Sequence, residues 1–315
     1  MQTISRASAS TAPHDSHPVT SGRKRRGRPD NKVAFMMLAP VLILLGIFVI
    51  FPALYAIYLS FYNWSFYSES EFVGLQNFRN VLIDPEFRAA IVRGLVFVLM
   101  TLPIQLLLSF LIATFITSVG RRAASTLKIA VYIPTIISAV ITSITFSLIY
   151  AYSGGLLNAV VGVFGIEDQA WIGDVRLALG AIAVPAIWMG LGLMTLIMVA
   201  AMLDIPESFY EAASMEGANW WQKTVYITIP QMKNIILYLL ITGFVAGIQQ
   251  YELPLVMTDG GPLNSTTLPN LFIFNHFRGD AYQGFSIAAA LLLFIVLGTI
   301  SAGVFRVLNS EKLVD

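Results

Sequence analysis

Few residues in this sequence have the type and spacing that catalytic chemistry requires. The chain has three histidines, His14, His17 and His276, and no cysteine, so it offers neither thiol chemistry nor two histidines on one helical face for a zinc ion. We interpret the His14-x-x-His17 spacing as part of a solvated tail. No Gly-x-Ser-x-Gly elbow presents a nucleophile, and no Gly-Lys dipeptide is available for a phosphate-binding loop. The sequence therefore predicts no catalytic residue, no metal site and no ATP site in this chain.

The composition indicates which elements the chain is built from. Hydrophobic residues make up 57% of the 315 residues and charged residues only 12%, whereas a soluble domain is about half apolar and a quarter charged. Six stretches are apolar for long enough to cross a bilayer, which takes about 20 helical residues. These predicted spans are 33–59, 91–118, 127–150, 177–202, 235–257 and 285–308. We therefore expect an all-α integral membrane protein with six transmembrane helices, whose membrane domain covers 33–308.

The basic residues predict how these spans are oriented. Most Lys and Arg residues lie in residues 1–32, in the second and fourth loops and at the C-terminal end, and loops rich in Lys and Arg stay in the cytoplasm. Both termini are therefore expected on the cytoplasmic side of the membrane. We interpret residues 1–32 as a disordered tail and 309–315 as a second, short tail. The basic run at 23–26 is expected to anchor the first span rather than to bind nucleic acid or anionic lipid.

The predicted spans contain almost no ionisable side chains. Glu252 lies near one span end, and Lys128 and Arg306 lie near others, where long side chains reach the interface. A carrier driven by protons or sodium usually needs such groups near the membrane midplane. An autonomous secondary transporter or channel remains the alternative interpretation, but the sequence favours a protein that takes its energy from another chain.

The cytoplasmic loop 203–234 is the most distinctive segment. Asp204 is suited to cap a helix, and Glu207 follows three residues later, as in a capping box. These residues predict a short helix over 205–216. Gly217 is expected to end that helix, because glycine adopts the left-handed backbone of a helix C-terminus without strain. The loop is therefore predicted to form a helical elbow on the cytoplasmic face.

This elbow resembles the EAA motif of permease subunits of bacterial binding-protein-dependent ABC importers, written E-A-A-x3-G-x9-I-x-L-P. The matching residues here are Glu211, Ala212, Ala213 and Gly217, followed by 227–230, with Ile229 in place of Leu. The resemblance implies the fold of a type I ABC importer transmembrane domain. It also implies that the elbow is a coupling helix, which seats in an ATPase subunit and transmits its closure to the membrane helices.

The resemblance extends over nearly the whole chain and narrows to the carbohydrate branch of these permeases. The segments 72–78 and 154–158 resemble its outer loops, and 257–267 resembles its T-x-G-G-P-x-x-x-T segment. By itself, Gly260-Gly261-Pro262 predicts a tight turn; the resemblance implies that this turn forms the outer rim of the permeation path and faces the binding protein. It further implies a heterodimer with a second permease subunit, an ABC ATPase dimer, an extracytoplasmic solute-binding protein and a sugar-like solute. ATP and Mg²⁺ would bind the partner ATPase, so no cofactor is expected on this chain.

Polar residues on otherwise apolar helices are expected to face the solute path, because lipid leaves their hydrogen bonds unmet. Gln250 and Tyr251 belong to the densest such group, at 249–252, although Gln side chains also hold membrane helices together. The resemblance carries sugar-contacting positions onto Ser153, Gly190 and Gln250. Two further lining positions fall on Ala186 and Leu193, which have no polar group.

Overall fold

The computed structural model describes residues 31–66 and 69–309, which are mainly helical. They divide into two compact units, the first ending at Ala53 and the second beginning at Leu54. The predicted tails at 1–32 and 309–315 fall almost entirely outside the described residues. Among the described residues, five helices are long and apolar enough to cross a membrane, or six if one bent helix pair is counted as a single span. The all-α class with six spans therefore agrees with the structure.

The first unit contains helix α1 (Asn31–Leu45), the π-helical segment η1 (Gly46–Ile50) and the start of α2 (Phe51–Leu59). The π-helical turn comes just before Pro52, which has no N–H to donate to the preceding turn. In this turn the Phe51 N–H donates to the carbonyl of Gly46, five residues earlier, and not to the carbonyl four residues earlier as in an α-helix. The proline is thereby accommodated and the apolar helix continues.

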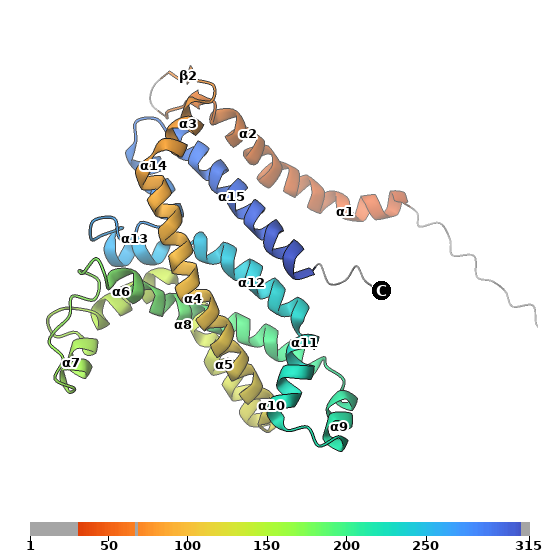
Figure 1. The fold of residues 1–315 in the computed structure, drawn as a ribbon. Helices are drawn as coiled ribbons and strands as arrows, with labels where there is room; N and C mark the ends of the chain where they lie inside the picture. Colours follow the sequence, from red (N-terminus) through yellow and green to blue (C-terminus); the bar gives the residue numbers. More distant parts are fainter. Residues whose placement is uncertain (1–30, 67–68, 310–315) are drawn as a thin grey trace, which may run out of the picture. The chain divides into compact units, whose positions relative to one another are not determined.

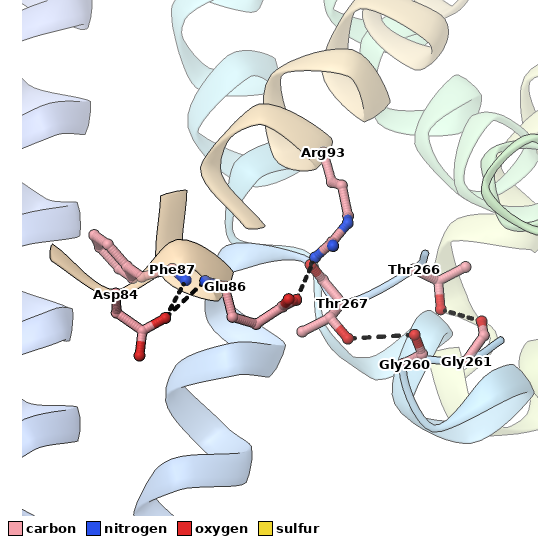
Figure 2. Close-up of polar contacts among 8 residues, drawn as sticks. All are labelled: Asp84, Glu86, Phe87, Arg93, Gly260, Gly261, Thr266 and Thr267. Carbon is pink, nitrogen blue, oxygen red and sulfur yellow. Dashed lines mark hydrogen bonds and ion pairs between the residues drawn. The ribbon is translucent and has the colours of Figure 1, made fainter. Parts of the chain in front are cut away.

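The second unit begins with a small outer structure that leads into its longest helix. Strands β1 (Tyr62–Asn63) and β2 (Glu71–Phe72) pair antiparallel, and α3 (Gln76–Ile83) follows. Asp84 then caps α4 (Pro85–Ser118): its carboxylate accepts hydrogen bonds from the backbone N–H groups of Glu86 and Phe87, at 2.7 and 3.0 Å (Figure 2). Proline in the first turn costs no helical hydrogen bond, so α4 starts before the predicted span at residue 91.

The third predicted span, 127–150, is wrong as a continuous helix. It is broken into α5 (Arg121–Ile136) and α6 (Ala139–Ile149), which are bent by 92°. Pro134 cannot donate to the turn before it, and Ile137 and Ser138 both have extended ψ angles, of 133° and 139°. The Ser138 hydroxyl accepts from the Val140 N–H at 3.3 Å and so starts a new helix.

The remaining helices include two that follow predicted spans closely, α8 and α15, and several short ones that lie in the predicted loops. They are α7 (Leu156–Gly162), α8 (Ala178–Leu203), α9 (Glu207–Met215), α10 (Trp220–Lys223), the π-helical η2 (Thr224–Thr228), α11 (Ile229–Gln231), α12 (Lys233–Ile248), α13 (Glu252–Thr258), α14 (Pro269–Gly279) and α15 (Gly284–Asn309). The fifth predicted span, 235–257, is interrupted because residues 249–251 are not helical.

Helix α8 is the central element of the second unit. It packs along α4 and α5, while α12 packs against α4 (Figure 1). One apolar core includes Phe97, Ile182 and Leu253, and another includes Met198 and Met232. The short helices α9 and α10 lie at the opposite end of this unit from α3 and the start of α4 (Figure 1). The elbow and the outer structure therefore lie at opposite ends of the same helices.

Candidate functional site

The predicted coupling segment forms helix α9, which carries Glu211, Ala212 and Ala213. Glu211 and Ala212 are exposed and Ala213 is half-buried, so part of the helix presents a nearly flat surface. Gly217 has a φ of +77° and ends the helix, as its predicted role requires. A Cβ added at Gly217 would meet no atom within 4 Å. This turn is therefore open toward its surroundings.

The start of α9 differs from the sequence prediction. The helix begins at Glu207, with Pro206 in the capping position and no side-chain cap. Asp204 instead follows the last turn of α8. Only 204–206 separate the two helices, and Pro206, with a ψ of 132°, holds the extended backbone that precedes the new helix. The elbow is therefore joined directly to the central helix.

Polar contacts hold the elbow in shape. The Tyr210 hydroxyl lies 3.0 Å from the Thr228 hydroxyl, and the Lys223 ammonium donates to the Ser214 hydroxyl at 2.7 Å. A capping box at Asn219 starts α10. A cleft of about 270 Å³ lies between this elbow and the ends of α4 and α8. The two short helices therefore form one connected unit, and Met215, 88% exposed, projects from it.

A central cleft of about 370 Å³ lies between α4, α5, α8 and α12. Gly190 and Gln250, two of the predicted path residues, line it, as do Ala186 and Leu193. Its polar lining residues are Thr101, Gln105, Thr135, Tyr238, Thr242 and Gln250, and the others are apolar or glycine. No charged side chain is among the lining residues that the structure describes. The cleft offers hydrogen bonds and apolar surface, a combination suited to binding small polar molecules.

The other two predicted path residues lie elsewhere. Ser153 is exposed in the turn after α6 and does not line the cleft. Tyr251 packs its ring against Phe274, with ring centroids 5.6 Å apart, and does not line the cleft either. The structure thus brings Gly190 and Gln250 together at one site and separates Ser153 and Tyr251 from it.

The sequence analysis missed Gln105, which lines the cleft from α4. Its Nε2 donates to the Ala186 carbonyl on α8 at 2.9 Å. Gly190 allows this approach, because a Cβ there would collide with the Gln105 amide. A lone glutamine in an apolar span was a usable signal, since such a group must find a partner inside the protein.

The predicted rim at Gly260, Gly261 and Pro262 is a tightly bonded turn, and Figure 2 shows the bonds of its two glycines. The Thr266 hydroxyl donates to the Gly261 carbonyl at 2.8 Å, and the Thr267 hydroxyl donates to the Gly260 carbonyl at 3.2 Å. Gly260 has a φ of +84°, which favours glycine. These bonds fix the shape of the turn between α13 and α14.

Three residues other than glycine in and beside this turn also have left-handed backbones. They are Asp259, Leu263 and Asn264, with φ values of 50°, 50° and 60°. Such conformations cost energy and persist only where the surroundings impose them. The side chain of Leu263 is 88% exposed, so the turn holds an apolar side chain out toward solvent. Arg93 of α4 connects this helix to the turn, because its guanidinium Nη1 lies 3.5 Å from the Thr267 carbonyl oxygen. The same nitrogen pairs with Glu86, also on α4 (Figure 2).

The described residues contain no group of three or more His, Cys, Asp or Glu side chains that could hold a metal ion. His276 is bonded to Asp280, with Nδ1 and Oδ2 2.8 Å apart, and its ring packs beside Phe272. This histidine is therefore engaged in local structure.

Comparison with known proteins gives consistent results for sequence and fold. Residues 85–312 match the family described as the binding-protein-dependent transport system inner membrane component. The trehalose/maltose transport system permease protein MalF of Thermococcus litoralis is 28% identical over 280 residues, covering 89% of this chain and 93% of that protein. A bacterial ABC transporter that imports the acidic polysaccharide alginate has a similar fold in its crystal structure, with a TM-score of 0.76, 21% identity and coverage of 90% of this chain and 96% of that one. The same type of transporter, crystallised with a periplasmic protein bound to an alginate pentasaccharide, gives a TM-score of 0.74 at 21% identity, covering 88% and 93% of the two chains.

Proposed function

We propose that this chain, which belongs to the family of binding-protein-dependent transport system inner membrane components, is the permease subunit of an ATP-driven importer for a sugar or a related solute. The family match over residues 85–312 is the observation that carries this proposal. The helical elbow at one end of the central helix and the uncharged cleft along it support the same assignment.

The proposed mechanism is alternating access, in which two permeases share one solute path. A solute-loaded binding protein docks outside, and a dimeric ATPase closes inside when it binds ATP. In this scheme Glu211, Ala212, Ala213 and Gly217 receive the movement of the ATPase, because they lie on the elbow and all but Ala213 are exposed. The chain performs no catalysis itself, and ATP and Mg²⁺ belong to the ATPase.

The proposed partners are a second permease, an ABC ATPase dimer and an extracytoplasmic solute-binding protein. The alginate transporter named above was crystallised with a periplasmic protein, which supports a binding protein for this chain. We place the rim turn at Gly260, Gly261 and Pro262 on the side of that protein, because the turn is rigidly bonded and exposes Leu263.

The proposed location is the bacterial inner membrane, with both termini in the cytoplasm. The family description supports the membrane, and the basic residues near the termini and in the second and fourth loops support the orientation. The elbow would then lie in the cytoplasm, where an ATPase is available to it.

The test is a gentle detergent purification of this chain from its native membrane, followed by identification of the co-purifying proteins by mass. A second permease and an ATPase with a phosphate-binding loop are the expected partners. The purified complex is then reconstituted into liposomes with its binding protein, and uptake of labelled sugars is measured with and without ATP. Uptake by the chain alone, without ATP, would overturn the proposal in favour of an autonomous carrier.

A further inference from the structure

Gln105 has hydrogen-bonding capacity that the protein itself does not use. A glutamine amide carries two N–H groups and a carbonyl oxygen that accepts hydrogen bonds. One N–H of Gln105 bonds to the Ala186 carbonyl at 2.9 Å. Within the described part of the chain, its oxygen Oε1 accepts no hydrogen bond, and the residue is only half-buried at the cleft. An acceptor and a donor are therefore open to a molecule in the cleft.

The bond to Ala186 is also exchangeable. Ala186 lies inside the continuous helix α8, so its carbonyl has a helical N–H partner four residues later. If Gln105 turned away, that carbonyl would keep its helical bond, and no buried group would be left without a partner. The Gln105 amide is thus able to exchange Ala186 for a hydroxyl group at low cost.

A second amide lines the same cleft from the break between α12 and α13. The Gln250 oxygen accepts from the Glu252 N–H at 3.2 Å, which leaves its Nε2 group as a donor. The hydroxyl groups of Thr101, Thr135 and Thr242 donate to backbone carbonyls at 2.9, 3.0 and 2.8 Å. The two amides, together with the hydroxyl group of Tyr238, which also lines the cleft, are therefore the groups best able to engage a solute.

This chain contributes no charged group to the cleft that would compensate a charged solute. No Lys, Arg, His, Asp or Glu lines it within the residues that the structure describes. An ion that enters such a site loses its hydration without gaining a counter-ion, which is strongly unfavourable. Uncharged hydroxyl groups, by contrast, both donate to and accept from amides.

We propose that the solute crossing this cleft is uncharged and rich in hydroxyl groups, and that Gln105 is a specificity-determining residue that exchanges its bond to Ala186 for a bond to the solute. This inference rests on the proposed function as an importer permease. Fold similarity does not decide the charge of the solute, since the structurally similar transporter imports an acidic polysaccharide.

The first test uses the complete transporter in liposomes with its own binding protein. The probes are the neutral sugars maltose, trehalose and lactose, and the anions galacturonate and glycerol 3-phosphate. ATP-dependent uptake is expected for a neutral probe and for neither anion. Uptake of an anion would overturn this inference while leaving the importer assignment intact. If none of the five probes were taken up, the inference on the solute would fall, whereas the importer assignment would still be decided by the co-purified ATPase and second permease.

The second test separates solute contact from helix packing. Ser109 lies one turn further along α4 and also donates to a carbonyl of α8, that of Leu191 at 3.4 Å, but it does not line the cleft. Gln105→Met and Ser109→Ala are compared by the number of solute molecules moved per ATP hydrolysed. We expect this ratio to fall about two- to tenfold in Gln105→Met, as for one lost neutral hydrogen bond, and to stay unchanged in Ser109→Ala. An unchanged ratio in Gln105→Met, or an equal fall in both variants, would overturn the role of Gln105.

Discussion

Gly192 is a position where one added methyl group should disturb the packing of α5 on α8. It lies on α8 where that helix crosses α5, and a Cβ there would lie 2.7 Å from the Val131 carbonyl oxygen and 3.0 Å from the Tyr132 Cα. It would also collide with the Thr135 hydroxyl. Because two of these contacts are backbone, no change of rotamer relieves them. Gly192→Ala must therefore push α5 away from α8.

The cost of this change follows from two losses. Overpacking a close helix contact costs about 1–3 kcal/mol. The hydrogen bond from the Thr135 hydroxyl to the Met189 carbonyl, 3.0 Å long, would also be lost, at about 1 kcal/mol. We therefore expect Gly192→Ala to destabilise the domain by about 2–4 kcal/mol in total.

The matched control is Gly298→Ala on α15, where a Cβ would meet no atom within 4 Å. This variant should be neutral, or more stable by up to about 1 kcal/mol, because alanine favours helix. Both variants would be purified in the complete transporter, and the temperature at which the complex loses its monodisperse peak on size-exclusion chromatography would be measured. Equal temperatures for the two variants would refute the close packing of α5 on α8.

Three further predictions concern the elbow and the outer loops. Gly217→Asp should abolish ATP-dependent uptake while the chain still inserts into the membrane, and uptake by this variant would contradict the coupling role. Gly217→Ala should lower the stability of the domain by only about 1 kcal/mol, because the φ of +77° is strained for alanine but the space around it is open. The Trp171 indole N–H donates to the Asn158 amide oxygen at 2.7 Å, so Asn158→Ala should loosen the loop after α7 and expose Trp171. Limited proteolysis measures this loosening, and an unchanged cleavage rate in the loop would contradict the prediction. Hydrogen bonds from Arg176 lower the pKa of Asp174 below its ordinary value. The stabilising contact between the two side chains should therefore hold at neutral pH and be lost as the pH falls through that lowered pKa. The chemical shift of the Asp174 carboxyl group reports this titration, and a midpoint at the ordinary pKa would refute the contact.

The positions of the spans could be predicted because apolar length alone decides which segments cross a bilayer. Helix α8, at Ala178–Leu203, differs from its predicted span 177–202 by a single residue at each end. The role of Gly217 could also be predicted, since a glycine after a short helix indicates a left-handed turn. These features depend on local sequence, and local sequence was available.

The breaks inside the spans were not predictable in the same way. Apolar residues continue through Ile137, so composition gave no sign that Ser138 starts a second helix at 92° to the first. The place of Gln105 depends on a carbonyl and a glycine that lie far along the chain, on α8. Ser153 and Tyr251 have suitable side chains, but Ser153 lies in the turn after α6 and Tyr251 packs against Phe274, so neither lines the cleft. Which polar groups come together at the cleft depends on the tertiary structure and cannot be predicted from local sequence.

The same helix connects the elbow to the cleft. Carbonyl groups at Ala186 and Met189 of α8 accept hydrogen bonds from Gln105 of α4 and Thr135 of α5, which both line the cleft. The last turn of α8 is followed by α9 after only 204–206. A movement imposed on α9 therefore reaches α8 without a flexible linker, and α8 carries it to the bonds that line the cleft. Because packed helices rearrange between discrete arrangements rather than deform smoothly, these two bonds are where we expect an outward-facing cleft to become an inward-facing one.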